Sequence, residues 1–153
     1  MKKIYLGCIV VIAVVAGGIV LPKGVEAVRV KDDGVSERQL ADELVGSTLN
    51  AYRNFSIPRF MSIFSDDFSP DRMQLINNID SSYSKIIVVD IEYFINKVMR
   101  DNGILAVTFK WQKRVQQRNI GQLVLTEGNA TFVFEEQDGS WKIIRIKGNN
   151  PLM

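Results

Sequence analysis

The chain has 153 residues, 19 of them basic and 17 acidic, which suits one domain with a hydrophobic core and is too short for two. It contains no histidine, so the commonest general base and the commonest metal ligand are both missing. The single cysteine, Cys8, cannot form an internal disulfide, and we expect neither a metal site nor a cofactor.

The first 27 residues have the pattern of an export signal. Lys2 and Lys3 precede the apolar run Ile4–Leu21, and Val25-Glu26-Ala27 supplies short side chains near a cleavage point. We predict cleavage after Ala27 and a periplasmic or secreted product. The alternative is an inner-membrane anchor, because the 18 residues of Ile4–Leu21 reach the lower limit of about 17–25 for a membrane span. Cys8 lies near the start of the run rather than after it, which disfavours lipid attachment.

The charge of the chain depends on this signal. Removing residues 1–27 takes away Lys2, Lys3, Lys23 and Glu26, which leaves 16 basic and 16 acidic residues. A mature chain of zero net charge lacks the excess of lysine and arginine that phosphate binding needs, so nucleic acid is not expected as a partner. It also contains no cysteine, and therefore no thiol nucleophile.

Three helices are expected in the first half of the mature chain. Val28–Val35 is a polar segment for which we expect no regular structure. Ser36 and Gln39 have the spacing of a capping box, and the repeat Leu40, Leu44, Thr48, Tyr52 predicts an amphipathic helix to about Arg53.

The next two helices are each marked by a proline. Ile57-Pro58 predicts a short helix with Phe60 and Phe64 on one face. Ser69-Pro70-Asp71 predicts a third helix, with Ser69 as its N-cap and an apolar stripe of Met73, Ile76 and Ile79.

Four strands follow, joined by turns. Ile86–Ile95 is rich in β-branched residues, and Asp101-Asn102-Gly103 ends the segment as a turn. Leu105, Val107, Phe109 and Trp111 alternate with polar residues, which is typical of a half-buried strand. Ile120–Glu136 is a long strand in which Gly128 suggests a bulge or bend, and Asp138-Gly139 is a hairpin turn before the last strand, Trp141–Lys147.

This order predicts an α+β domain over residues 36–153, with three helices packed on one face of a curved, mainly four-stranded antiparallel sheet. It resembles the NTF2-like superfamily, with its ketosteroid-isomerase-like, cone-shaped architecture. The resemblance rests on four segments: Phe60–Phe68, Glu127–Phe134, Asp138–Ile144 and Gly148–Leu152. It implies the fold and no particular activity, because enzymes and purely binding proteins share this architecture.

Catalysis by this fold would need a carboxylate inside the cone. The resemblance suggests an Asp or Glu base opposite a tyrosine, for which Asp90, Glu92, Glu127 and Tyr93 are the candidates. Asp90 and Glu92 share one strand face, and Ile91 and Tyr93 share the other. The carboxylates are therefore as easily placed on the solvated face, and we expect none of them deep in an apolar pocket opposite a free tyrosine hydroxyl.

The aromatic residues of the second half can serve either a ligand pocket or the core. The pocket candidates are Phe60, Phe64, Phe109, Trp111, Phe132 and Trp141. We expect Phe60, Phe64, Phe109, Phe132 and Trp141 to be buried together between helices and sheet.

The basic residues of the sheet form a second group. Lys110, Gln112 and Arg114 share a strand face, and Arg145 and Lys147 lie near the chain end. They can face an anionic partner or simply a solvated surface.

The sequence thus favours an exported, non-enzymatic domain that binds a small apolar ligand or an envelope protein, with a homodimer through the sheet face as a further possibility. Two alternatives stay open: an anchored assembly subunit of an envelope or secretion complex, and a small isomerase or lyase.

Overall fold

The computed structural model describes residues 23–153, so the apolar run Ile4–Leu21 lies outside the described residues. The chain divides into two units between Ser36 and Glu37, and the account below concerns the second, Glu37–Met153. Within residues 23–153, no helix has both the length and the apolar character of a membrane span.

The helical layer consists of α2 (Lys23–Arg53), α3 (Ile57–Ile63) and α4 (Arg72–Tyr83). Helix α2 begins well before Ser36, so the expected capping box lies inside the helix and segment 28–35 is helical. No proline interrupts this stretch, and Gly34 costs a helix only about 1 kcal/mol. The expected repeat faces the core: Thr48 and Tyr52 are buried, and Leu40 and Leu44 are partly buried against the core.

Two helix boundaries differ from those expected. Phe64 begins strand β1 (Phe64–Ser69) instead of continuing α3, although its ring still contacts Phe60, with centroids 5.0 Å apart. Helix α4 is capped by Asp71, whose carboxylate accepts from the backbone N–H of Gln74 at 3.0 Å, and Ser69 lies outside it.

The apolar stripe of α4 is also rotated from the one expected. Leu75, Ile76, Ile79 and Tyr83 are buried, whereas Met73 is half exposed.

The sheet has five strands in the order β1-β5-β4-β3-β2, one more than expected. Strands β2 (Ile86–Asp101), β3 (Ile104–Gln117), β4 (Leu123–Gln137) and β5 (Ser140–Gly148) form the antiparallel part, and β1 pairs with β5 in parallel. The two expected turns are confirmed, since Asn102, Gly103, Asp138 and Gly139 all have positive φ. The polar sequence of β1 gives little strand signal, which explains the miss.

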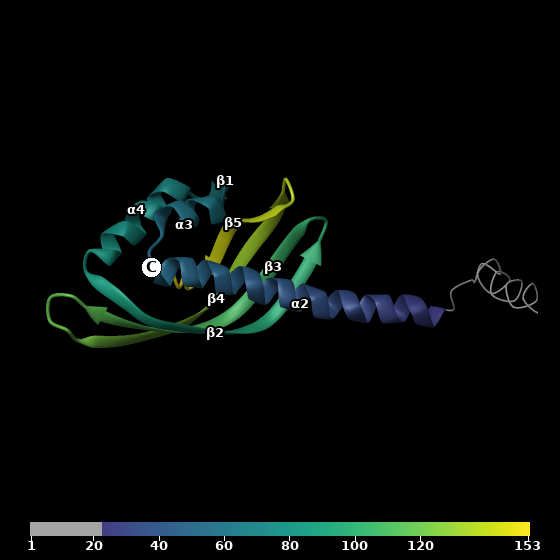
Figure 1. Ribbon diagram of the computed structural model, residues 1–153, viewed down its shortest axis with the longest axis horizontal. Helices are drawn as coiled ribbons and strands as arrows, with labels where there is room; N and C mark the ends of the chain where they lie inside the picture. The colour runs from purple at the N-terminus through teal and green to yellow at the C-terminus, as the bar shows by residue number, and fades with distance from the viewer. Residues whose placement is uncertain (1–22) are drawn as a thin grey trace, which may run out of the picture. The chain divides into compact units, whose positions relative to one another are not determined.

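The sheet curves around the helical layer, so that it has an inner and an outer face (Figure 1). On β3 the inner positions are Leu105, Val107, Phe109, Trp111, Lys113 and Val115, all buried, and the alternating positions between them face outward. Phe109, Phe132 and Phe134 form the centre of the core and pack edge-on, with centroids 4.8 and 6.2 Å apart. Trp141 was expected in the core but is only half-buried. It pairs with Glu136 next to the turn Asp138-Gly139, and the Arg100 guanidinium lies over its ring.

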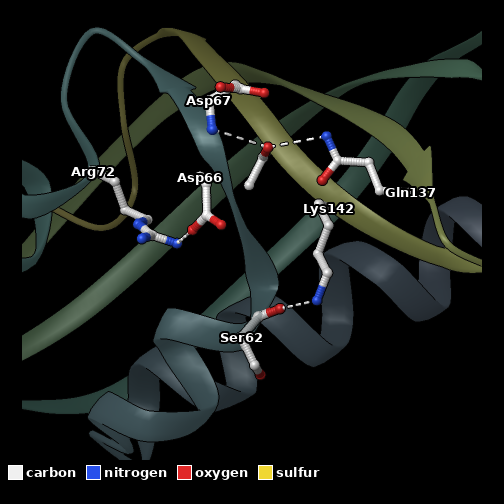
Figure 2. A network of polar contacts seen from close by, with 7 residues as sticks. Ser62, Asp66, Asp67, Arg72, Gln137 and Lys142 are labelled. Atoms are coloured by element: carbon white, nitrogen blue, oxygen red, sulfur yellow. Dashed lines mark hydrogen bonds and ion pairs between the residues drawn. The ribbon is translucent and has the colours of Figure 1, made fainter.

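A polar network fastens β1 to its neighbours (Figure 2). The buried Ser65 hydroxyl accepts from the Asp67 N–H at 3.1 Å and from Gln137 at 3.0 Å. Lys142 of β5 donates to the Ser62 carbonyl of α3, and Arg72 of α4 pairs with Asp66. These contacts join β1 to β4 through Ser65 and to α4 through Asp66, and they join β5 to α3 through Lys142.

Gly128 is not a bulge, because the β3–β4 register runs unbroken through the pair Trp111–Gly128. A Cβ there would lie 2.6 Å from the Asn149 Cβ and 3.0 Å from the Trp111 ring. The glycine therefore allows the segment Asn149–Met153, which follows β5, to pass close to the sheet.

Strand β2 forms one edge of the sheet. Its pairing with β3 is interrupted twice, between Val88 and Asp90 and between Ile95 and Lys97. From α2, the Arg38 guanidinium donates to the Ile95 carbonyl at 3.0 Å.

Candidate functional sites on the two faces of the sheet

The inner face of the sheet is filled by side chains. Four of the six pocket candidates, Phe60, Phe64, Phe109 and Phe132, are at most 4 % exposed and belong to one continuous core with Trp111. A narrow hollow among the helices, lined by Tyr52, Phe60 and Ile79 among others, has a volume of about 10 Å³. That is room for about one water molecule and not for an organic ligand.

Lys113 is the unexpected residue of this inner face. Its side chain is buried, and its ammonium group donates to the Tyr52 hydroxyl at 3.2 Å and to the main-chain oxygens of Pro151 and Met153, both at 2.8 Å. Burial lowers the pKa of Lys113 to about 8. The sequence carried the signal for this residue, because strict alternation from Leu105 to Val115 places position 113 on the apolar face.

Tyrosines surround the same region. The Tyr83 hydroxyl donates to the Tyr52 carbonyl, and burial raises the pKa of Tyr52 to about 12 and that of Tyr83 still further. Tyr93 also faces inward. Its hydroxyl donates to the Asp42 carboxylate at 3.0 Å, and burial, together with this bond, raises the pKa of Tyr93 to about 12.

The carboxylates proposed for catalysis lie on the other face. Asp90, Glu92 and Glu127 occupy outward positions of β2 and β4, where Glu92 pairs in register with Gln112 and Gln112 with Glu127. Asp90 accepts from Arg114 at 2.8 Å, and this bond keeps the pKa of the Asp90 carboxyl below its ordinary value. The carboxylate that does meet Tyr93 is that of Asp42, at an exposed position rather than in a closed cavity.

The outer face also exposes large apolar side chains. Phe94 is 66 % exposed, Leu125 56 % and Met99 52 %, on β2, β4 and β2 respectively. A shallow hollow of about 350 Å³ lies beside Leu125 and is otherwise lined by Asp90, Glu92, Gln112 and Arg114.

Charges on this face are partly separated along the strands. Asp90, Glu92 and Glu127 lie toward one end, with Arg114 among them. Lys97, Arg145 and Lys147 lie toward the other end, and Asp101 and Glu135 occupy the outward positions beyond them. Lys110 occupies the level between the two ends and lies 3.7 Å from Glu127. Lys110, Gln112 and Arg114 therefore share a face, as expected, but among acidic neighbours.

Among the residues that the structure describes, no group of three or more Asp, Glu, His or Cys side chains gathers closely enough to hold a metal ion.

Comparison with known proteins identifies the architecture. No protein-family model and no curated protein sequence matches the chain. Among solved structures, an NTF2-like superfamily protein from Salmonella enterica serovar Typhimurium aligns with a TM-score of 0.64 at 14 % identity, over 77 % of this chain and 93 % of that one.

Two further structures of the same architecture have different roles. A hexachlorocyclohexane dehydrochlorinase (LinA type 2) aligns with a TM-score of 0.56 at 16 % identity, over 78 % of this chain and 88 % of its own. The association domain of CaMKII from C. elegans aligns with a TM-score of 0.52 at 11 % identity, over 78 % and 99 %. At such low identity the likeness shows the fold alone, and fold does not decide between an enzyme and an assembly domain.

Proposed function

We propose that this chain, which has an NTF2-like fold, is an exported, non-enzymatic assembly domain that pairs with a second copy of itself through the outer face of its sheet. The observation that carries the proposal is the contrast between the two faces. The inner face is filled, whereas the outer face exposes Phe94, Leu125 and Met99. Large apolar side chains exposed on one sheet face are typical of interaction surfaces. An association domain among the structures of similar fold supports the same reading.

The distribution of charge favours a second copy as the partner. In the proposed dimer, the outer faces of two sheets lie against each other. A two-fold axis runs between them, perpendicular to the strands, at the level of Lys110. Because this axis reverses the strand direction, the acidic end of one copy meets the basic end of the other. Glu92 of one copy then lies opposite Lys97 of its partner, and Phe94, which pairs in register with Lys110, is covered at the axis. Complementary charge fixes the register of such an interface more than it adds affinity.

An isomerase or lyase reading is weaker on the same observations. Asp90, Glu92 and Glu127 lie on the outer face, where water solvates them, so they lack the burial that raises a carboxylate pKa toward neutrality. A small apolar ligand is also disfavoured while the inner face remains filled.

Sedimentation equilibrium of the exported protein tests the pairing. We expect a dimer at micromolar concentration and a monomer for Phe94→Glu and Leu125→Glu, because each places a carboxylate where the partner would cover an apolar side chain. Ile120→Glu is the matched control: Ile120 is 63 % exposed but lies in the turn between β3 and β4, so this variant stays dimeric.

A charge exchange tests the orientation. Glu92→Lys and Lys97→Glu should each weaken the dimer, roughly 3- to 10-fold in Kd, and the double variant should recover it. A protein that is monomeric at every concentration contradicts self-pairing and leaves a different envelope protein as the partner of this face. A dimer that the outer-face variants do not change places the interface elsewhere.

A further inference from the structure

The turn between β3 and β4 exposes aliphatic side chains at one end of the sheet. Ile120 in the turn and Leu123 at the start of β4 are each 63 % exposed, and Ile87 at the start of β2 is 41 % exposed. Leu123 and Ile87 both pair in register with Gln116, so they lie on the same, outer side of the sheet. Ile87, Ile120 and Leu123 are called the apolar tip below. Figure 1 shows that this turn extends beyond the end of α4.

The turn is held in shape by its own backbone. The Gln117 N–H donates to the Gln122 carbonyl at 2.9 Å, and the Gly121 N–H donates to the Gln117 carbonyl at 2.8 Å. Gly121 has a φ of +68°, a conformation that favours glycine. The turn therefore fixes Ile120 in an exposed position, where its side chain adds nothing to the core.

The charged residues next to the apolar tip are basic. Segments 81–89 and 115–126, which meet at this end of the sheet, contain Lys85 and Arg118 and no acidic residue. Both basic residues are exposed. Arg118 also fastens the turn to the end of α4, because its side-chain Nε–H donates to the Tyr83 carbonyl at 3.0 Å.

The acidic residues of the outer face lie farther from the turn. Asp90 is paired with Arg114 at 2.8 Å, and Glu92 and Glu127 occupy the next outward level. The distance from Leu123 to Glu127 along an extended strand is about 13 Å. A segment at a membrane interface buries its apolar side chains only about 5–10 Å deep. The apolar tip can therefore enter a bilayer while these carboxylates remain outside it.

We propose that the apolar tip enters the surface of a membrane with anionic headgroups, and that Lys85 and Arg118 lie among those headgroups. Aliphatic side chains on a projecting turn need no complementary pocket, because acyl chains surround them from all sides. The two cations add the attraction that basic residues beside an anionic membrane provide. The apolar area that enters is small, so the contact is weak and reversible.

Fluorescence quenching tests the proposal in the exported protein. Ile120→Trp is mixed with vesicles made of equal parts phosphatidylglycerol and phosphatidylcholine, whose acyl chains carry bromine. Bromine quenches a tryptophan only near contact. After the signal of the unaltered protein, which contains Trp111 and Trp141, is subtracted, the quenching reports on residue 120, whether or not residues 1–27 have been removed.

Met73→Trp is the matched control. Met73 is half exposed in the first turn of α4, whereas Arg118 contacts the last residue of that helix, Tyr83. We expect quenching of Ile120→Trp to be at least about 3-fold stronger than that of Met73→Trp. Equal quenching would mean that the domain adsorbs without a preferred orientation, and this would overturn the proposal. No quenching of Ile120→Trp would overturn it too, and would leave a protein as the partner of the apolar tip.

A second substitution shows whether the native side chains matter or only the introduced tryptophan. Adding Leu123→Ser to Ile120→Trp should weaken the quenching at least about 3-fold, because it removes an apolar side chain from the tip. Leu123 is exposed, so this change leaves the core intact. Undiminished quenching would show that the tryptophan enters by itself, and would contradict the proposal.

Lipid charge and Lys85 test the role of the headgroups. In brominated phosphatidylcholine alone, we expect quenching of Ile120→Trp to be at least about 3-fold weaker. Lys85→Gln should weaken it at least about 2-fold on anionic vesicles, whereas Lys147→Gln, at the other end of the outer face, should leave it unchanged. Equal quenching by the two lipids would contradict a preference for anionic headgroups.

The inference does not depend on the proposed pairing. Phe94 lies at the level of Lys110, away from the turn, so adding Phe94→Glu should leave the quenching of Ile120→Trp in place while it abolishes the dimer. A failure of pairing and a failure of insertion therefore give different results. Loss of quenching with Phe94→Glu would mean that the outer face, and not the apolar tip, holds the domain on the vesicle, and this would overturn the proposal.

Discussion

At the scale of single residues, the buried ionisable groups predict how stability depends on pH. The pKa of Lys113 is about 8 in the folded domain, against 10.5 for a free lysine. Between these values the unfolded chain holds a proton that the folded domain has lost, so stability rises with pH in this window. Tyr52 and Tyr93 have pKa values of about 12 instead of 10.0, so above pH 10 the unfolded chain loses protons first and stability falls.

Urea unfolding between pH 7 and pH 11.5 measures this profile. We expect a maximum near pH 10, with a rise of up to roughly 3 kcal/mol that Lys113→Met abolishes while the fall above pH 10 remains. A decline in stability from pH 8 upward would mean that Lys113 stays charged in the folded state.

The aromatic core predicts a large effect for a single truncation. Phe132 is fully buried between Phe109 and Phe134, so Phe132→Ala should cost about 3–5 kcal/mol of unfolding free energy. Ile120→Ala, at an exposed turn position, should change it by less than about 0.5 kcal/mol. Chemical denaturation at one pH compares the two, and a loss below about 1 kcal/mol for Phe132→Ala would contradict the central place of this ring.

At the scale of helices and strands, the start of α4 tests a side-chain cap. Asp71 accepts the backbone N–H of Gln74, and its charge lies at the positive end of the helix. Asp71→Ala should therefore cost about 1 kcal/mol, and Asp71→Asn should recover most of it. Ser69→Ala is the comparison, because Ser69 lies at the end of β1 and does not cap the helix. Equal losses for the two alanine variants, measured by thermal unfolding, would contradict this assignment.

The elements that the sequence predicted well are those with a strong period. The alternation of Leu105, Val107, Phe109 and Trp111 predicted the faces of β3 correctly, and both glycine-containing hairpin turns were found. Strand β1 was missed because its pairing with β5 is parallel and distant in sequence, and Phe64-Ser65-Asp66-Asp67 has little strand propensity of its own. The early start of α2 was missed because a capping pattern at Ser36 does not exclude a helix that continues through it.

The candidate sites were less predictable than the fold. Alternation correctly separates Asp90 and Glu92 from Tyr93, but it does not say which face is covered until the helices are placed. Lys113 could have been noted as a charged residue at an apolar position. Its partners Pro151 and Met153 follow only from the three-dimensional course of the segment after β5.

At the scale of the whole molecule, the destination of the chain rests on its first 27 residues. We expect cleavage after Ala27, so that the mature protein begins at Val28 and is recovered from the soluble periplasmic fraction. Intact-mass measurement of the expressed protein decides this. A chain that keeps its first residues and sediments with membranes would instead support the anchored assembly subunit. Ala27→Leu should block processing, because signal peptidase requires a small residue at this position.

The interrupted edge of the sheet has a consequence for aggregation. A long, regular edge strand offers unpaired N–H and C=O groups to any other chain and so promotes aggregation. Strand β2 is long, but its register breaks at Val89 and Asn96, Lys97 follows the second break, and Arg38 occupies the Ile95 carbonyl. We therefore expect that a second chain cannot pair strand to strand along β2 and extend the sheet into a fibre. Association at this edge would have to use side-chain contacts.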